Sequence, residues 1–145
     1  MGLDGLTEKD LTLVRKGGSA DIKSPFRVLD IAKKLDIEIG FGSIFGFPWN
    51  TRSDLDSQSA HIHSVIDYGK EIGVTPLIMG GAFTPFPGSS LGRKVFGGEL
   101  VGVKVVRQEP EFFDFHRPNI DTPNWSHQEL ENFLVKHFKS LMERG

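Results

Sequence analysis

The chain contains no cysteine among its 145 residues. This absence excludes disulfide bonds, thiolate metal sites and cysteine nucleophiles, and it is typical of proteins from a reducing compartment. No apolar run approaches the roughly 18 residues that a membrane-spanning helix needs, and the N-terminus carries no signal-peptide pattern. We therefore expect a cytoplasmic protein that does not contact a membrane.

The chain also lacks an excess of charge of either sign. Its formal net charge is -2, so no general attraction to nucleic acid is expected. It has no G-x-x-x-x-G-K-[ST] phosphate loop, and Ser89–Ser90 lacks the elbow motif of a serine hydrolase. His61 and His63, two apart on a predicted helix, point away from each other. The other three histidines are scattered without a carboxylate at ligand spacing, which disfavours a metal site.

What the chain does have is 17 glycines and eight prolines, clustered where predicted elements end. A strand predicted over Ile37–Gly46 is followed by a capping box at Thr51–Asp54, which begins a helix. A second strand, predicted over Val74–Met79, runs into glycines and the proline-rich turn Thr84–Ser89. Because (βα) proteins hold their ligands at strand ends that open into such loops, the pattern predicts an α/β fold with parallel strands and a ligand face.

Further helices are predicted from capping signals. Thr7–Asp10 reads as a capping box, Ser24–Pro25 as an N-cap followed by proline, and Ser126–Glu129 as a capping box before a long apolar stripe. Residues 80–125 are poorly periodic, with a possible hairpin over Gly98–Val106. Two parallel strands leave both sheet edges unpaired, and no strand is predicted before the first helix, so we expect that an upstream part is missing.

Several segments together resemble one family. Gly2–Gly17, Gly42–Gly46 (G-x-I-x-G), Thr84–Ser89 (T-P-F-P-G-S) and Phe113–Pro118 are similar, in this order and spacing, to the C-terminal half of a radical S-adenosylmethionine (SAM) enzyme core. The nearest likeness is to the group that often carries an upstream cobalamin-binding domain. The resemblance implies a partial (βα) TIM-like barrel over residues 1–95. It also implies a C-terminal extension over residues 96–145 that ends in an amphipathic helix.

The resemblance also implies two sets of site residues. Those that would cradle SAM are Asp4, Gly42, Ile44 and Gly46. Those that would border the substrate are Thr84, Phe86 and Gly88. Each set has a structural alternative: the glycines can serve a bent strand in a tight barrel, Asp4 can cap a turn, and Phe86 can fill the core.

The departures from the family concern its catalytic parts. The cysteine loop that binds a [4Fe-4S] cluster has no counterpart, so radical chemistry would need a missing N-terminal half or a cysteine-bearing partner. Asp4–Gly5 stands in place of the family's Glu-Ser, and Trp49–Thr51 stands in place of its Gly-Glu-Thr. Cobalamin dependence stays open, because no D-x-H-x-x-G segment is present. Whether the chain is an enzyme therefore stays open too.

Two other functions remain as alternatives. One is a non-catalytic domain that self-associates, or pairs with a partner, through its open sheet edge, for example as a homo-oligomer that rebuilds a barrel. The glycine pairs Gly80–Gly81 and Gly97–Gly98 also fit a phosphate-binding barrel fragment.

Overall fold

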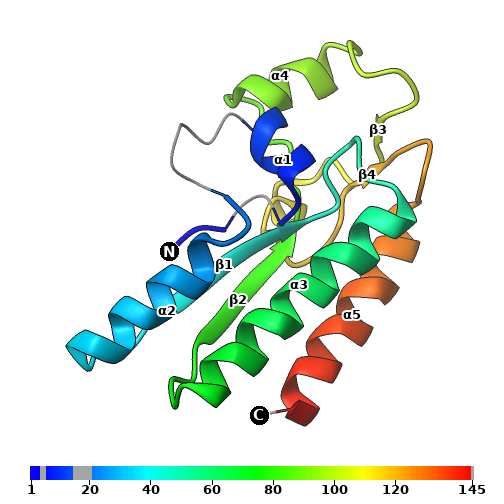
Figure 1. Ribbon diagram of the computed structural model, residues 1–145. Coiled ribbons are helices and arrows are strands. Elements are labelled where there is room, and N and C mark those ends of the chain that lie inside the picture. The colour runs from blue at the N-terminus through cyan, green and yellow to red at the C-terminus, as the bar shows by residue number, and fades with distance from the viewer. Residues whose placement is uncertain (4–5, 15–20, 145) are drawn as a thin grey trace. The chain divides into compact units, whose positions relative to one another are not determined.

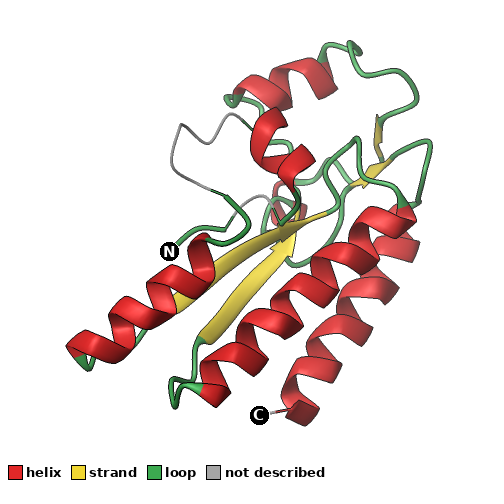
Figure 2. Cartoon of the chain, viewed as in Figure 1, coloured by secondary structure: helices red, strands yellow, loops and turns green. Residues whose placement is uncertain are grey.

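The structure is a computed structural model that describes residues 1–3, 6–14 and 21–144 (Figure 1). Its elements in chain order are α1 (Glu8–Leu13), α2 (Ser24–Leu35), β1 (Gly40–Phe45), α3 (Arg52–Glu71), β2 (Leu77–Ala82), α4 (Ser90–Phe96), β3 (Lys104–Val105), the 3-10 helix η1 (Pro110–Phe112), β4 (Ile120–Asp121) and α5 (His127–Arg144). Helices and strands alternate from α2 to β2 (Figure 2). The predicted α/β class and the C-terminal helix are confirmed.

The contacts divide the chain into two compact units. The first unit consists of Met1–Ile44 and Asp56–Gly80, and the second of Phe45–Leu55 and Gly81–Gly145. The division at residue 95 into a barrel part and an extension stays a prediction. Within the described ranges, no helix is both long enough and apolar enough to cross a membrane.

β1 and β2 are neighbours in one sheet, and their arrows point the same way in Figure 1. Leu77 N donates to Ile39 O at 3.0 Å, and Phe83 N donates to Phe45 O at 2.7 Å. In both bonds the donor residue follows the acceptor residue by the same number of positions, as a parallel ladder requires. The predicted parallel pair is therefore confirmed, although each strand begins three residues later than predicted.

Residues 1–3 add a strand position on the other side of β1. Gly2 forms a parallel bridge with Gly42. Gly42 N donates to Met1 O at 2.8 Å, and Leu3 N donates to Gly42 O at 2.6 Å. This contact is an isolated bridge and not a strand, so the first element along the described residues is α1, in line with the expectation that no strand precedes the first helix.

The two faces of this sheet differ in burial. In β1, Phe41 and Ser43 are buried, while the alternate residues are half-exposed. A Cβ on Gly40 would lie 3.5 Å from Met79 Cε, so Met79 shares the half-exposed face. We call this the open sheet face; its members in the first unit are Gly40, Gly42, Ile44, Leu77 and Met79. The side chains of Leu77 and Met79 are 62% and 54% exposed, so an apolar surface remains uncovered by the described chain.

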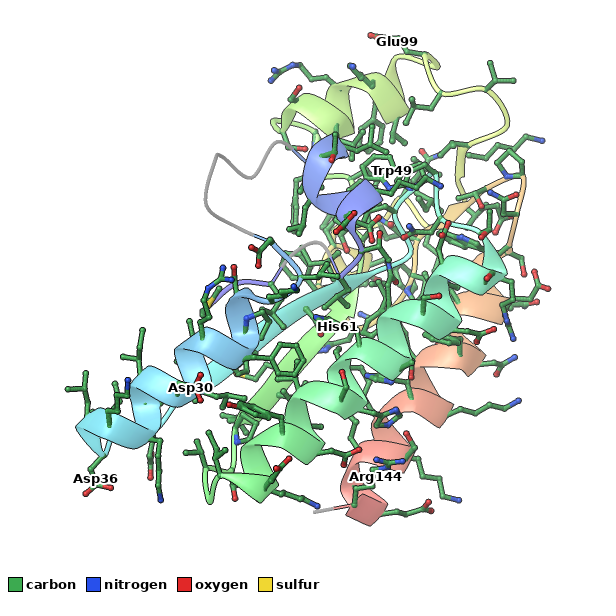
Figure 3. All side chains as sticks on the ribbon, in the orientation of Figure 1. Asp30, Asp36, Trp49, His61, Glu99 and Arg144 are labelled. Atoms are coloured by element: carbon green, nitrogen blue, oxygen red, sulfur yellow. The ribbon has the colours of Figure 1, made fainter. Side chains whose placement is uncertain are left out.

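Helices α2 and α3 pack against each other in the first unit. The Phe26 ring meets His61 and Tyr68 edge-on, with centroids 5.8 and 5.4 Å away. The Tyr68 hydroxyl donates to Asp30 Oδ1 at 2.6 Å; Figure 3 labels Asp30 on α2 and His61 on α3. Helix α2 begins at Ser24, so its N-cap is Lys23 and not Ser24 as predicted.

Helix α1 is held by a buried carboxylate. The predicted cap is present: Asp10 N donates to Thr7 Oγ1 at 3.1 Å. The Asp10 side chain is fully buried and accepts from Thr7 Oγ1 at 2.8 Å and from Gln58 Nε2 at 2.7 Å. Because a buried charge must be compensated by hydrogen bonds, this contact ties α1 to α3.

The second unit contains β4 and α4, which the sequence did not predict. Lys104 pairs with Asp121, and Val105 with Ile120, in an antiparallel ladder. A strand is therefore present in the segment Gly98–Val106 where a hairpin was predicted, but its partner strand lies well beyond residue 106. Helix α4 was missed because its seven residues are too few for a clear period.

Helix α5 follows its predicted capping box. Ser126 N donates to Glu129 Oε2 at 2.7 Å, and Glu129 N donates to Ser126 Oγ at 3.3 Å. Leu130, Phe133 and Leu134 of the predicted stripe are buried, and the Phe133 ring lies 5.7 Å from that of Phe45. The apolar stripe therefore forms part of the core of the second unit.

Asp121 links β4 to the start of α5. Its Oδ1 accepts from His127 N at 2.7 Å and lies 2.7 Å from His127 Nδ1. Burial by itself raises the pKa of this carboxyl, but the hydrogen bonds from His127 outweigh burial, so the pKa lies below the usual 3.8. Because the folded-state pKa is depressed, the stabilisation is present above about pH 4 and is lost as the pH falls through the folded pKa.

We predict that Asp121→Asn lowers the free energy of unfolding at pH 7, and that this difference from the unmodified chain shrinks as the pH is lowered below the folded-state pKa. Urea denaturation at a series of pH values from about 7 to about 2 measures it. Asp56→Asn, at an exposed position on α3, is the control and should show a small difference. A difference for Asp121→Asn that stayed constant with pH would contradict the assignment.

Candidate functional site

The residues predicted to face SAM fall into both units. Asp4 lies outside the described residues. Gly42 and Ile44 lie on the open sheet face of the first unit, where the nearest atom to a Cβ on Gly42 would be Met1 O at 4.0 Å. The face of the strand at Gly42 is thus open, with no side chain in the way of a ligand, although Gly42 N and Gly42 O are both bonded to residues 1–3.

Gly46, in the second unit, has a different environment. Its φ is +76°, and a Cβ there would overlap Leu130 Cδ2 and lie 3.1 Å from Leu130 Cδ1. The space beside Gly46 is therefore filled by α5. This geometry explains the glycine by chain conformation and helix packing, which was the structural alternative to ligand contact.

The substrate-facing candidates lie together in one turn of the second unit but differ in exposure. Thr84 is 5% exposed, and its hydroxyl donates to Ala82 O at 3.4 Å. Phe86 is 36% exposed, and no atom lies within 4 Å of a Cβ built on Gly88. Phe86 and Gly88 therefore present the surface of the turn, whereas Thr84 faces its interior.

Phe86 belongs to a group of aromatic rings from three segments. We call it the phenylalanine cluster; its members are Phe86, Phe96, Phe113 and Phe115. The Phe86 centroid lies 6.2 Å from that of Phe113 and 5.2 Å from that of Phe115. Phe96, at the end of α4, is stacked with Phe113 at 6.3 Å. Sequence reasoning missed Phe96 because the helix that carries it was not predicted.

Two glycines, Gly81 and Gly92, allow the backbone carbonyl groups of Phe115 and Phe86 to approach them closely. Phe115 has a positive φ of 64°, and its carbonyl accepts from Ala82 N at 2.7 Å. A Cβ on Gly81 would overlap that carbonyl oxygen, and a Cβ on Gly92 would overlap the carbonyl oxygen of Phe86. Glycine is therefore required at both positions for steric reasons.

The other tail aromatics have structural contacts. Phe112 lies between two guanidinium groups, with Arg107 Cζ 5.3 Å and Arg117 Cζ 4.5 Å from its centroid. Both cations are already paired, Arg107 with Glu131 at 3.1 Å and Arg117 with Asp114 at 2.9 Å. Burial by itself raises the pKa of Asp114, but the hydrogen bonds from Arg117 and His116 outweigh burial and lower it. These arginines therefore offer little charge to an anion.

Within the part of the chain that the structure describes, no group of three or more histidine, aspartate or glutamate side chains is placed to hold a metal ion. Burial lowers the pKa of His61, whose ring packs edge-on against Phe26. His137 is buried against Phe45, with centroids 4.7 Å apart. These histidines contribute to packing.

The glycine pairs considered for phosphate binding also have packing roles. A Cβ on Gly80 would overlap Ser43 Oγ, and Gly81 is covered by the Phe115 carbonyl. A Cβ on Gly97 would lie 2.9 Å from Arg93 O. Protein atoms thus occupy the space next to Gly80, Gly81 and Gly97, whereas no atom lies within 4 Å of the Cβ position of Gly98. Three of the four glycines are therefore explained by packing.

The described part of the first unit has a small hollow and a larger groove. One, of about 20 Å³ beside Met1, His61 and Pro25, has room for little more than a water molecule. The other, a groove of about 340 Å³, is lined by Lys33, Asp36 and neighbouring residues. It lies at the end where β1 and β2 begin, whereas ligands of parallel sheets bind at the carboxyl ends of the strands.

No family model matches the chain, and no curated protein matches it significantly. The motifs and the geometry described above therefore carry the functional argument.

Proposed function

We propose that the chain supplies the SAM- and substrate-facing half of a radical SAM barrel, and that a cysteine-bearing partner or an N-terminal half supplies the rest. The supporting observation is the strand order. Residues 1–3, β1 and β2 are parallel neighbours in chain order, with helices between them, which is the arrangement of a (βα) barrel. The open sheet face then corresponds to the inner side of that barrel.

The residues of this chain fit SAM but do not fit an iron–sulfur cluster. A chain with no cysteine does not fit an iron–sulfur cluster, so no step through a cluster is assigned to it. Gly42 fits SAM because no atom lies closer than 4.0 Å to its Cβ position, which leaves that face of the strand open, and Ile44 would give SAM an apolar contact on the same face. Bound SAM would supply the adenosyl group for hydrogen abstraction. The chain's own residues would orient that group and exclude water from it.

We predict that the purified chain binds SAM saturably in isothermal titration calorimetry and that Gly42→Val weakens binding at least about tenfold. A valine at Gly42 meets no atom closer than 4.0 Å at its Cβ, so the fold is retained while the isopropyl group occupies the binding face. Ala60→Val, at an exposed position on α3, adds the two methyl groups of the same side chain elsewhere and is the control.

Failure of the folded chain to bind SAM would contradict the proposal. Equal affinity in Gly42→Val would also do so, because it would place SAM elsewhere. The need for a partner has its own test: anaerobic reconstitution of this chain alone should yield neither a bound cluster nor 5′-deoxyadenosine. Formation of both would overturn it.

A second candidate, a non-catalytic domain that pairs with a second copy, is favoured by the exposure of Leu77 and Met79. Association would bury these side chains and cover the edge of β2. If this is the function, sedimentation equilibrium should show a mass that rises toward the dimer with concentration. Met79→Lys should then weaken the dimer about tenfold or more, because it places a charge in an apolar contact.

Met142→Lys is the matched control, since Met142 is 82% exposed on α5, and it should leave the dimer unchanged. A monomer at all concentrations would exclude this second candidate.

A further inference from the structure

We propose that the phenylalanine cluster binds a small apolar carboxylic acid, with the apolar part against the exposed rings and the carboxylate against the Arg93 guanidinium. This goes beyond the proposed function, because the surface lies wholly in the second unit and needs neither SAM nor another half-barrel. Three observations carry it: the exposure of contiguous rings, their fixed backbone, and an uncompensated cation beside them.

The first observation is that three rings of the cluster are both exposed and connected. Phe86, Phe96 and Phe115 are 36%, 46% and 44% exposed, and Phe113 joins them through the ring contacts given above. Single exposed apolar side chains are ordinary, but a contiguous aromatic patch is typical of a binding surface. A ligand with one flat apolar body would remove several ring faces from water together.

The second observation is that the backbone that carries two of the rings, at Phe86 and Phe115, is held in place before any ligand arrives. Phe115 keeps a left-handed backbone conformation that is unfavourable for a residue with a side chain. Its carbonyl is fixed by Ala82 N, and the Phe86 carbonyl lies against the first turn of α4, where Ser89 Oγ donates to it at 2.8 Å. Since this backbone needs little further ordering, a small ligand can bind at a lower entropic cost.

The third observation is the charge beside the rings. Arg93 lies one helical turn before Phe96, on the same side of α4. Its Nη1 donates to Gly88 O at 2.7 Å, which places the guanidinium beside the turn that carries Phe86. Unlike Arg107 and Arg117, it has no carboxylate partner within the described residues. Its remaining N–H groups can therefore receive a carboxylate.

The test is an NMR titration of the ¹⁵N-labelled full chain with 3-phenylpropionate, 3-phenylpropionamide and propionate. We expect 3-phenylpropionate to bind with a dissociation constant on the order of millimolar, as its size allows. Shift changes should be confined to the turn at Phe86, the end of α4 and residues 113–116. The amide, which lacks the charge, should bind at least about fivefold more weakly than 3-phenylpropionate. Propionate, which lacks the ring, should also bind at least about fivefold more weakly.

Two variants separate the parts of the site. Arg93→Gln should weaken 3-phenylpropionate about fivefold and leave the amide unchanged, whereas Lys94→Gln, at the neighbouring exposed position, should change neither. Phe115→Gly removes a ring while relieving the positive φ, so the chain stays folded, and it should weaken both aromatic ligands at least about threefold.

The proposal is overturned by any of three results. The first is that the folded chain shows no saturable binding of 3-phenylpropionate. The second is that the shift changes are centred on the open sheet face. The third is that shifts at the cluster change with protein concentration in the absence of ligand, which would assign the cluster to contact with a second copy. SAM calorimetry on the same sample is independent of this titration, so failure of one proposal is distinguishable from failure of the other.

Discussion

Replacing Gly46 by alanine is expected to lower the free energy of unfolding by about 2–4 kcal/mol. Two effects add at this position. The φ of +76° is unfavourable for a residue with a Cβ, and the new methyl group would overlap the Leu130 side chain. Because Leu130 is fully buried in the core of the second unit, it has little room to move away. Urea denaturation followed by far-ultraviolet circular dichroism measures the loss.

Gly98→Ala is the matched control, because Gly98 has a φ of +70° but no atom within 4 Å of its Cβ position. It should cost only about 1 kcal/mol. The double variant Gly46→Ala with Leu130→Ala should lose less than the sum of its single variants, since removing the leucine side chain relieves the overlap. Equal losses for Gly46→Ala and Gly98→Ala would mean that Leu130 does not fill this space.

This result also bears on the SAM proposal. A variant at Gly46 that failed to bind SAM would report a damaged fold and not a lost contact. Gly42, on the open sheet face, has room for a side chain and is therefore the position at which ligand contact can be tested.

Replacing Trp125 by alanine is expected to lower the free energy of unfolding by about 3–5 kcal/mol. The indole is 3% exposed, and its Nε1 donates to Asn50 O at 3.1 Å. The Asn50 side chain in turn accepts from Phe47 N at 2.8 Å. The tryptophan therefore ties the loop between β1 and α3 to the segment before α5, and its loss would leave a cavity in the second unit.

Trp125→Phe separates the hydrogen bond from most of the apolar burial and should cost about 1–2 kcal/mol. Trp49→Phe is the control, since Trp49 is half-exposed and stacked on Phe47 (Figure 3 labels Trp49). It should change stability by no more than about 0.5 kcal/mol. Similar losses for Trp125→Phe and Trp49→Phe would contradict the proposed role of the buried indole N–H.

The helix starts were the most predictable features of the fold. At Thr51–Asp54, Thr51 N donates to Asp54 Oδ2 at 2.8 Å and Asp54 N donates to Thr51 Oγ1 at 3.2 Å, as the capping-box pattern predicts. The cap of α5 at Ser126–Glu129 was predicted equally well. Each of these interactions spans three residues, so its partners are visible as neighbours in the sequence.

The strand pairings were less predictable. The strand position of residues 1–3 depends on Gly42, and β3 depends on β4, far along the chain in both cases. Segments this short carry no period of their own, and only their partners make them strands. The phenylalanine cluster belongs to the same class, because its rings come from segments that are brought together only by packing.

The sequence by itself determined the α/β class, the main helices, the parallel strands and the absence of cysteine chemistry. Local capping, hydrophobic period and composition carry that information. Only the tertiary structure distinguished the two glycines of Gly42–Gly46, which are equivalent in the motif. Gly42 is open on a sheet face, and Gly46 lies beneath Leu130. The reason is that the space available to a glycine depends on residues distant in the chain, which no local pattern records.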